Sequence, residues 1–238
     1  MKYKIELIGT GIKVIALTKL FLEPHFGDIA WSCSGLLAKE GTKATILCIF
    51  SAKKCHLLKT KQSNGSQWYL KKNEKKYAKM MNTDLHFFNY AKYDLRNRPP
   101  QKFFTPILSP LEQNLLCELT TKLKEYVRNN NVTEIYCPKA SRSHIDHLLV
   151  KQAATQFIDS HTVYYYEDCP TFIDDQKYFP SFEPNLEEIQ IDISSVLPQK
   201  YKGMLVFDEL IKSFFTSKEA LKSLIHKRPY EKYWRIHY

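Results

Sequence analysis

Residues 19–52 read KLFLEPHFGDIAWSCSGLLAKEGTKATILCIFSA, and this stretch decides the expected fold. Residues 19–25 are a short apolar run closed by a proline and a histidine, typical of a buried strand that runs into a loop. Residues 28–41 place apolar side chains at helical spacing, with an aspartate at the start and a glycine as a stop signal. Residues 43–52 form a continuous apolar run that suits a parallel strand covered on both faces. The stretch therefore predicts a strand, a helix and a second strand.

The alternation of strands and helices continues along the chain. Further strands are expected at residues 84–90, 132–138 and 162–168, and further helices around 73–82 and at 109–130, 147–158 and 218–227. Crossover-sized spacing between strands is typical of a doubly wound sheet. Residues 172–194 carry prolines and aromatic residues and are expected to be irregular. We therefore expect a single α/β domain over residues 1–238, Rossmann-like and doubly wound, with a mostly parallel sheet.

Composition excludes several classes of protein. Hydrophobic residues make up 44% of the chain and charged residues 25%, as in ordinary globular proteins. No apolar run approaches the ~20 residues that span a bilayer, and the N-terminus lacks the pattern of a signal peptide. The six cysteines form no C-x-x-C pair and lie mostly in apolar stretches, which indicates a reducing compartment. We expect a cytoplasmic protein without a transmembrane segment.

The net charge of +10 comes mostly from lysines, which are dense between Lys53 and Lys79. The simplest interpretation of this run is a solvated surface, because charge acts on solubility before it acts on function. An alternative is that the lysines receive an anionic part of a small substrate. No sequence pattern of a nucleic-acid-binding module accompanies them, so no nucleic-acid partner is expected. The sequence does not indicate an oligomeric state.

Polar clusters follow three of the predicted strands, where ligands bind in open α/β sheets. They read PHFGD at residues 24–28, SHIDH at 143–147 and YYYED at 164–168. The i, i+3 spacing of His25 with Asp28, and of His144 with His147, brings two side chains to one side of a helical turn. Two imidazoles and one carboxylate with an open fourth position describe a catalytic zinc site. We therefore expect His25, Asp28 and His147 to bind zinc or another divalent metal, although each short motif alone also fits a helix cap or a polar loop.

On these motifs the chain resembles the LmbE-like zinc-dependent de-N-acetylases, relatives of the N-acetylglucosaminyl phosphatidylinositol deacetylases known as PIG-L. PHFGDIAWSCSG at residues 24–35 is similar to the first motif of the family, and HIDHLLVKQAA at 144–154 to the second. VYYYEDCP at 163–170 is similar to a run in one branch, and NYAKYDLR at 89–96 and YEKYWR at 230–235 are fainter matches. The resemblance covers about residues 18–238.

The resemblance implies roles for individual residues. It places the metal on His25, Asp28 and His147, and it places His144 at the substrate carbonyl, with Asp146 orienting that imidazole. The fainter matches imply that six further residues lie near the substrate: Tyr93, Asp94, Arg96, Tyr166, Glu167 and Asp168. For Tyr166, Glu167 and Asp168, a solvated strand end is an equal interpretation. The implied activity is hydrolysis of an N-acyl group, with an N-acetylated amino sugar or its conjugate as the small-molecule substrate.

Gly27 is a departure from the family pattern, which has the general base of hydrolysis at this position. Loss of a positioned base costs ~10² to 10⁴ in rate. Three explanations remain open. In the first, hydrolysis continues more slowly or with Glu23, Asp146 or His144 as a substitute base. In the second, the metal serves a reaction without attacking water, such as acyl transfer, condensation or elimination. In the third, the chain is an inactive binding protein. A plainer interpretation is that Gly27 only relieves a tight turn.

Overall fold

The centre of the molecule is a seven-stranded sheet with the order β5-β4-β3-β6-β7-β9-β8. In the computed structural model, the first five strands of this order run parallel, and β9 pairs antiparallel with both β7 and β8. The strands of this sheet are β3 (Thr18–Glu23), β4 (Ala44–Cys48), β5 (Asp84–Phe87), β6 (Val132–Pro138), β7 (Thr162–Tyr166), β8 (Leu186–Asp192) and β9 (Tyr230–Ile236). The predicted mostly parallel, doubly wound α/β fold is confirmed.

The structure describes residues 3–8, 11–16, 18–41, 44–52, 64–96, 103–168 and 185–236. Its α-helices are α1 (Asp28–Ser32), α2 (Ser34–Glu40), α3 (Asn64–Met80), α4 (Pro110–Asn129), α5 (Ile145–Thr155), α6 (Leu197–Leu205), α7 (Asp208–Phe214) and α8 (Lys218–Lys227). Short 3-10 helices lie at Tyr93–Leu95 and Ser194–Val196. A hairpin of β1 (Tyr3–Ile8) and β2 (Gly11–Ala16) forms a separate two-stranded sheet. Within the described part of the chain, no helix is long and apolar enough to cross a membrane.

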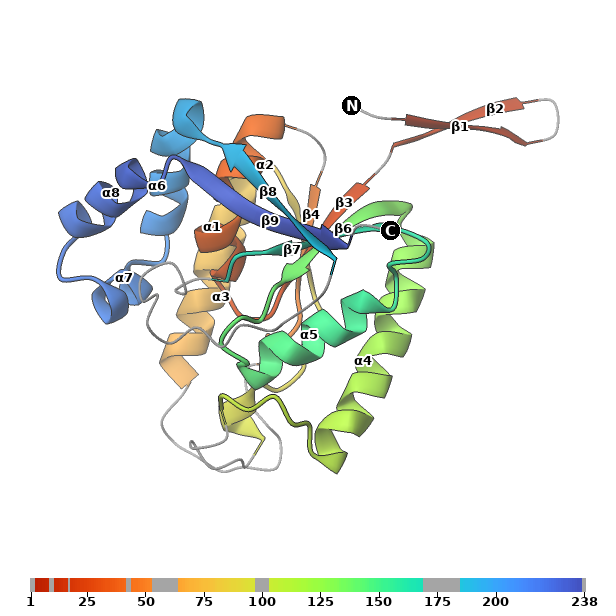
Figure 1. Cartoon of the computed structure of the whole chain (residues 1–238), viewed down its shortest axis with the longest axis horizontal. Helices are drawn as coiled ribbons and strands as arrows, with labels where there is room; N and C mark the ends of the chain where they lie inside the picture. Colours follow the sequence, from red (N-terminus) through yellow and green to blue (C-terminus); the bar gives the residue numbers. More distant parts are fainter. Residues whose placement is uncertain are drawn as a thin grey trace.

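Helices cover both faces of the sheet (Figure 1). Helices α4 and α5 pack on one face, in a core that includes Leu20 and Leu47 of the strands. Helices α1 to α3 and α6 to α8 pack on the other face, with Phe21 and Ile46. Successive residues of β3 and β4 therefore point into opposite cores, which explains their continuous apolar sequence.

The site lies where the winding of the sheet reverses. From β3 the chain proceeds outward to β4 and β5, and it then returns to β6 on the other side of β3. The loops that follow β3 and β6 therefore separate at the carboxyl edge of the sheet and leave a crevice between them. The predicted metal ligands follow these two strands.

The C-terminal part of the chain is more regular than its sequence suggests. The interval 172–194, expected to be irregular, contains strand β8, while residues 169–184 lie outside the described part. Along β8 the exposure alternates because one face of this edge strand contacts solvent, and its acidic residues there hide the apolar pattern. The helix expected at 28–41 is divided at Cys33 into α1 and α2, and it ends as predicted at Gly41, which has φ of 55°.

Candidate metal and substrate site

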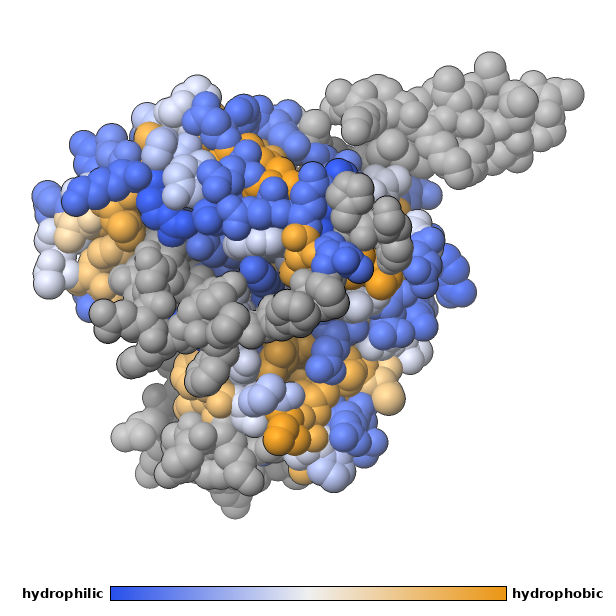
Figure 2. All heavy atoms as spheres, viewed as in Figure 1, coloured by the Kyte–Doolittle hydropathy of each residue, from blue (hydrophilic) through white to orange (hydrophobic). Residues whose placement is uncertain are grey.

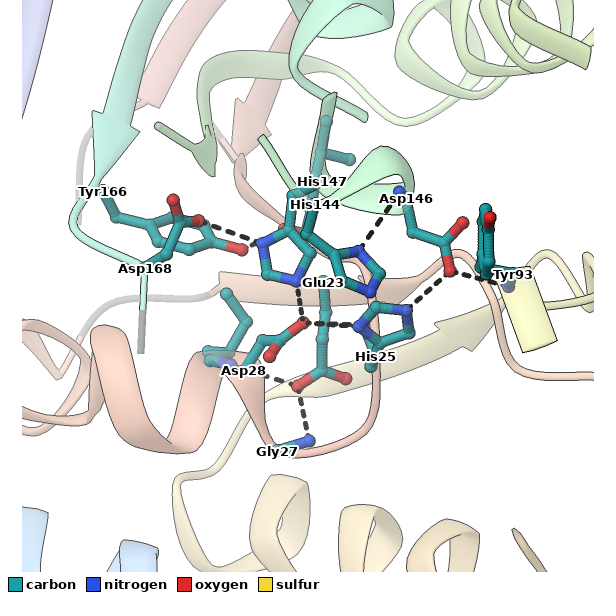
Figure 3. Close-up of polar contacts among 12 residues, drawn as sticks. Glu23, His25, Gly27, Asp28, Tyr93, His144, Asp146, His147, Tyr166 and Asp168 are labelled. Carbon is teal, nitrogen blue, oxygen red and sulfur yellow. Dashed lines mark hydrogen bonds and ion pairs between the residues drawn. The ribbon is translucent and has the colours of Figure 1, made fainter. Parts of the chain in front are cut away.

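A tight turn between β3 and α1 positions the first two candidate ligands (Figure 3). His25 lies in this turn, and Asp28 is the first residue of α1. Gly27 has φ of 94°, a left-handed conformation that glycine adopts without strain. The turn brings the Asp28 carboxylate back toward His25, whose backbone N–H donates to Asp28 Oδ2 at 2.7 Å. Sequence spacing of three residues thus becomes direct contact.

The third candidate ligand comes from the loop and helix after β6. His144 caps the N-terminus of α5, and His147 lies in the first turn of that helix. Asp28 Oδ2 lies 3.6 Å from His25 Nδ1 and 3.4 Å from His147 Nε2, so the three predicted metal ligands converge. His144 also belongs to the cluster: one nitrogen from each of the three histidines lies within 4.8 Å of the others. This donor set suits a divalent metal.

A carboxylate contacts the outer nitrogen of each of the two candidate-ligand imidazoles. His25 Nε2 lies 2.7 Å from Asp146 Oδ2, and His147 Nδ1 lies 3.0 Å from Asp168 Oδ1. When these nitrogens donate to the carboxylates, the opposite nitrogens, His25 Nδ1 and His147 Nε2, face Asp28 with free lone pairs. Carboxylates behind metal-binding histidines fix the tautomer and ring orientation in this way.

These contacts also set the proton affinity of His25. Burial alone would lower its pKa, but the hydrogen bonds to Asp146 and Asp28 and their negative charges outweigh burial and raise the pKa to about 9. The pKa of Asp146 is held well below its usual range because burial is outweighed by His25 and by Arg96. Without a metal, the site is therefore prepared to hold a positive charge.

The role expected for Asp146 needs correction. We expected its carboxylate to orient His144, but it contacts His25, accepts from Arg96 Nη2 at 2.7 Å and accepts from the backbone N–H of Tyr93 at 3.0 Å. Only the backbone N–H of Asp146 reaches His144, donating to its Nδ1 at 3.2 Å. The first turn of α5 directs the carboxylate sideways toward the loop at Tyr93.

His144 is held as a neutral hydrogen-bond donor. Burial, together with the neighbouring His25 and His147, lowers its pKa to about 3. Because Nδ1 accepts the Asp146 backbone N–H, the proton of the neutral ring lies on Nε2. Phe103 and Phe104 lie against the ring, with centroids 6.2 and 5.6 Å from it. An N–H held in this way suits contact with a carbonyl oxygen or an oxyanion.

Two buried carboxyl groups lie behind Gly27. Glu23 Oε1 accepts from the backbone N–H groups of Gly27 and Ile29 at 3.1 Å, and Glu74 Oε2 accepts from Gly27 at 2.9 Å. Burial raises the pKa of Glu74 to about 8 and that of Glu23 well above its usual range, so the pair retains a proton at neutral pH. Neither side chain lines the cavities of the site. Both side chains instead hold the backbone of the turn through hydrogen bonds on the side away from the cavities.

Two cavities of about 310 Å³ each adjoin the candidate ligands. Asp28, His147 and Asp168 line the first cavity only. Asp146, Lys92 and Asp94 line the second cavity only. Both cavities are bordered by the same four residues: His25, Phe26, His144 and Leu210. The histidine cluster therefore lies at the junction of two spaces large enough for a small organic molecule.

Of the residues expected near the substrate, only some line these cavities. Tyr93 and Asp94 line the second cavity, Asp168 lines the first, and Arg96 acts through Asp146. Tyr166 and Glu167 line neither cavity. The Tyr166 hydroxyl donates to the Leu22 carbonyl oxygen inside the core, and Glu167 pairs with Arg228. Strand β7 ends at Tyr166, so the alternation of the strand does not set the directions of Glu167 and Asp168.

The lysine-rich stretch does not adjoin the site in the described residues. Residues 53–63 lie outside the described part of the chain, and no lysine of α3 lines either cavity. On α3, Lys71 lies 3.8 Å from the centre of the Phe87 ring. Lys92 contributes to the second cavity instead.

Several apolar residues of the site were not predicted. They are Trp31, Phe103, Phe104, Leu210 and Phe214. The adjacent pair Phe103–Phe104 before a predicted helix was the available sequence signal. Leu210 and Phe214 belong to α7, which lies far from His25 in the sequence, and only the packed fold brings them together.

Metal content tests the ligand set. His147→Ala and Asp28→Ala are expected to lose a tightly bound divalent ion, because each removes a converging donor atom. His144→Ala is expected to retain the ion, because its Nε2 carries a proton. Elemental analysis after dialysis against zinc measures this, with His226→Ala, at an exposed histidine of α8, as the control. Equal loss in His144→Ala and His147→Ala would instead indicate a three-histidine set.

The contact between Asp146 and His25 predicts a pH dependence. A proton competes with the metal on His25 below its pKa of about 9, so metal affinity falls as the pH decreases from there to neutral. Asp146→Asn removes a charge that raises this pKa, so the affinity of the variant should change less with pH. At high pH the variant should bind metal ~10- to 100-fold more weakly. Zinc titrations against a competing chelator test both effects, and identical pH dependence in the two proteins would contradict the assignment.

Packing explains the glycine at position 27. A Cβ there would lie 3.0 Å from Leu210 Cδ1 and 3.2 Å from Phe207 Cδ1. Gly41 also has positive φ but has nothing within 4 Å of such a Cβ. Gly27→Ala should therefore destabilise the protein by ~1–3 kcal/mol, and by more than Gly41→Ala. Urea unfolding measures the difference, and equal losses would show that α7 does not restrict this position.

Comparisons with known proteins agree with this geometry. Residues 20–158, more than half of the chain, match the family model PIG-L, described as GlcNAc-PI de-N-acetylase. The 2'-N-acetylparomamine deacetylase of Streptomyces fradiae is 27% identical over 204 residues, which cover 79% of this chain and 71% of the relative.

Solved structures share the fold at low sequence identity. Teicoplanin deacetylase Orf2 in its zinc-inhibited form has a TM-score of 0.78 at 13% identity, covering 92% of this chain and 98% of that one. GalB, the 4-carboxy-2-hydroxymuconate hydratase from Pseudomonas putida KT2440, has a TM-score of 0.59 at 14% identity, covering 93% and 96%. The fold, the paired motifs and the family match lead to one conclusion: the chain belongs to the PIG-L (GlcNAc-PI de-N-acetylase) family.

Proposed function

We propose that this protein is a zinc-dependent deacetylase that hydrolyses an N-acyl amino sugar or a conjugate of one. The observation that carries the proposal is the convergence of His25 Nδ1, Asp28 Oδ2 and His147 Nε2 beside a cavity, with a carboxylate behind each imidazole. Deacetylases among its relatives support the reaction class, and the Streptomyces fradiae relative supports an amino-sugar substrate. One domain carries the whole reaction.

The donor set fits zinc better than a hard metal. Two imidazole nitrogens and one carboxylate oxygen, with space beside them, are typical of catalytic zinc, whereas magnesium and calcium prefer oxygen ligands. Bound there, the metal would polarise the amide carbonyl and lower the pKa of a water molecule to ~7. The remaining steps depend on side chains of this chain.

Hydrolysis breaks the amide C–N bond, adds the oxygen of water to the acyl carbon and transfers a proton to the amine. In the proposed reaction His144 donates its Nε2–H to the carbonyl oxygen as negative charge develops there. The low pKa of His144, about 3, keeps this donor neutral. Asp146 and Asp168 hold the two ligand imidazoles in the tautomers that expose lone pairs to the metal.

The proposed reaction also needs a general base that takes a proton from the attacking water. Gly27 has no side chain at the position where the family pattern has a base. Glu23 lies behind the turn, Asp146 is bound by His25 and Arg96, and the exposed nitrogen of His144 carries a proton. Because none of these three offers a free basic atom at the cavity, we propose hydrolysis that is ~10² to 10⁴ slower than with a positioned base.

The test is release of free amine from N-acetylated amino sugars by the zinc-loaded protein. Activity should disappear on chelation and return with zinc. His144→Ala should lower kcat by ~10² to 10³ while its zinc content is unchanged, and His226→Ala should behave as wild type. Bound zinc without hydrolysis of any N-acyl sugar would contradict the proposal. It would favour acyl transfer, elimination or a binding role without catalysis, and the hydratase GalB is an example of different chemistry on this fold.

A further inference from the structure

The two cavities at the histidine cluster differ in which apolar and charged side chains border them, and this difference bears on the substrate. Beyond the candidate ligands, the first cavity is lined mainly by apolar side chains: Phe26, Trp31, Phe104, Leu210 and Phe214. Arg142 and Asp168 are its other charged groups, and Asp168 is engaged by His147. The second cavity is also lined by apolar side chains, including Phe50, Leu70 and Phe103, but Lys92 and Asp94 border it and pair at 3.1 Å near its surface.

The residues shared by the two cavities indicate where a scissile bond would lie. His144 and His25 border both spaces, and the extended Phe103–Phe104 segment pairs with the backbone at His144. Because side chains alternate along an extended segment, Phe104 enters the first cavity and Phe103 the second. An amide that reaches the cluster therefore has one substituent on each side.

The residues that line each cavity indicate which of them receives the sugar and which receives the acyl group. A sugar needs hydrogen-bond donors and acceptors, which the second cavity supplies through Lys92 and Asp94. An acetyl group has a single methyl group, whereas the first cavity has a volume of about 310 Å³. A hydrocarbon chain would fill this apolar space and release its water.

Apolar surface continues outside the first cavity. Phe104 and Phe214 are 56% and 43% exposed at its border, and Ile107 and Leu111, which follow Phe104 in the sequence, are more than 70% exposed. Figure 2 shows apolar side chains gathered on this side of the molecule, around the N-terminal ends of α4 and α5. A chain longer than the cavity would thus leave it over apolar surface.

We infer that the first cavity is an acyl subsite, and that the preferred substrates carry a linear acyl chain of several carbons rather than an acetyl group. The inference rests on the proposed amide hydrolysis for its reaction, but binding tests it separately. Trp31 and Leu210 form the inner part of this subsite, and Phe104 and Phe214 form its entrance.

The experiment compares glucosamine carrying N-acetyl, N-butanoyl, N-hexanoyl and N-octanoyl groups. With zinc-loaded protein, kcat/KM should rise ~4-fold for each added methylene, the equivalent of ~0.8 kcal/mol, until the cavity is filled. Phe104→Ala and Phe214→Ala should reduce this dependence on chain length. Trp68→Ala is the matched control, because Trp68 is 55% exposed on α3 and lines neither cavity.

Calorimetry with chelated, metal-free protein measures binding of the acetyl and octanoyl compounds without turnover. Tighter binding of the octanoyl compound, weakened by Phe104→Ala, supports the subsite even if no compound is hydrolysed, in which case only the proposed reaction fails. If the acetyl compound is hydrolysed as well as the longer ones, the acyl subsite is wrong while deacetylation stands. Equal binding of the acetyl and octanoyl compounds would likewise overturn the subsite, whatever the activity assay shows. Equal chain-length dependence in Phe104→Ala and Trp68→Ala would also overturn it.

Discussion

The turn between β3 and α1 is the constraint on which the site depends. Its left-handed residue, Gly27, reverses the chain so that Asp28 contacts the His25 backbone, and Glu23 and Glu74 accept the N–H groups that the turn leaves without helical partners. Both carboxyl groups are buried, and burial favours their protonated forms. Desolvation of the two carboxyl groups costs stability, and their hydrogen bonds to the backbone of the turn offset part of this cost.

Charge in the site is arranged in alternating layers. Asp28 lies between the imidazoles of His25 and His147, and Asp146 and Asp168 lie on their outer sides. Each of these two histidines is therefore placed between two carboxylates. Arg96 compensates Asp146 from the far side. This arrangement raises the pKa of His25 and His147, while His144, which has no side-chain carboxylate partner among these groups, is kept neutral. Three similar residues thus acquire two different chemical characters.

Much of this arrangement follows from the sequence. The apolar runs of β3 and β4 and the helical spacing after Asp28 predict the doubly wound sheet, which in turn brings residues after β3 and β6 to one edge. The contact of Asp146 with His25 was not predictable, because the direction of a side chain in the first turn of α5 depends on the packed loop at Tyr93. Leu210 and Phe214 were equally inaccessible, since nothing in the local sequence of α7 indicates that it packs on the Gly27 turn.

The glycine at position 27 illustrates the difference between sequence and structure. From the sequence it indicates a missing base, whereas in the fold its conformation and the contacts with Phe207 and Leu210 restrict the position to a residue without a side chain. Phe207 and Leu210, at the start of α7, pack against the turn beside the first cavity. Leu210, which restricts Gly27, also lines both cavities.

We propose that His25, Asp28 and His147 share one metal ion and that His144 does not bind it. Anomalous diffraction at the zinc absorption edge, from crystals grown with zinc, tests this most directly. We expect a single strong peak within ~2.0–2.2 Å of His25 Nδ1, Asp28 Oδ2 and His147 Nε2, with His144 Nε2 beyond coordination distance. A peak bonded to His144, or none between these three residues, would contradict it.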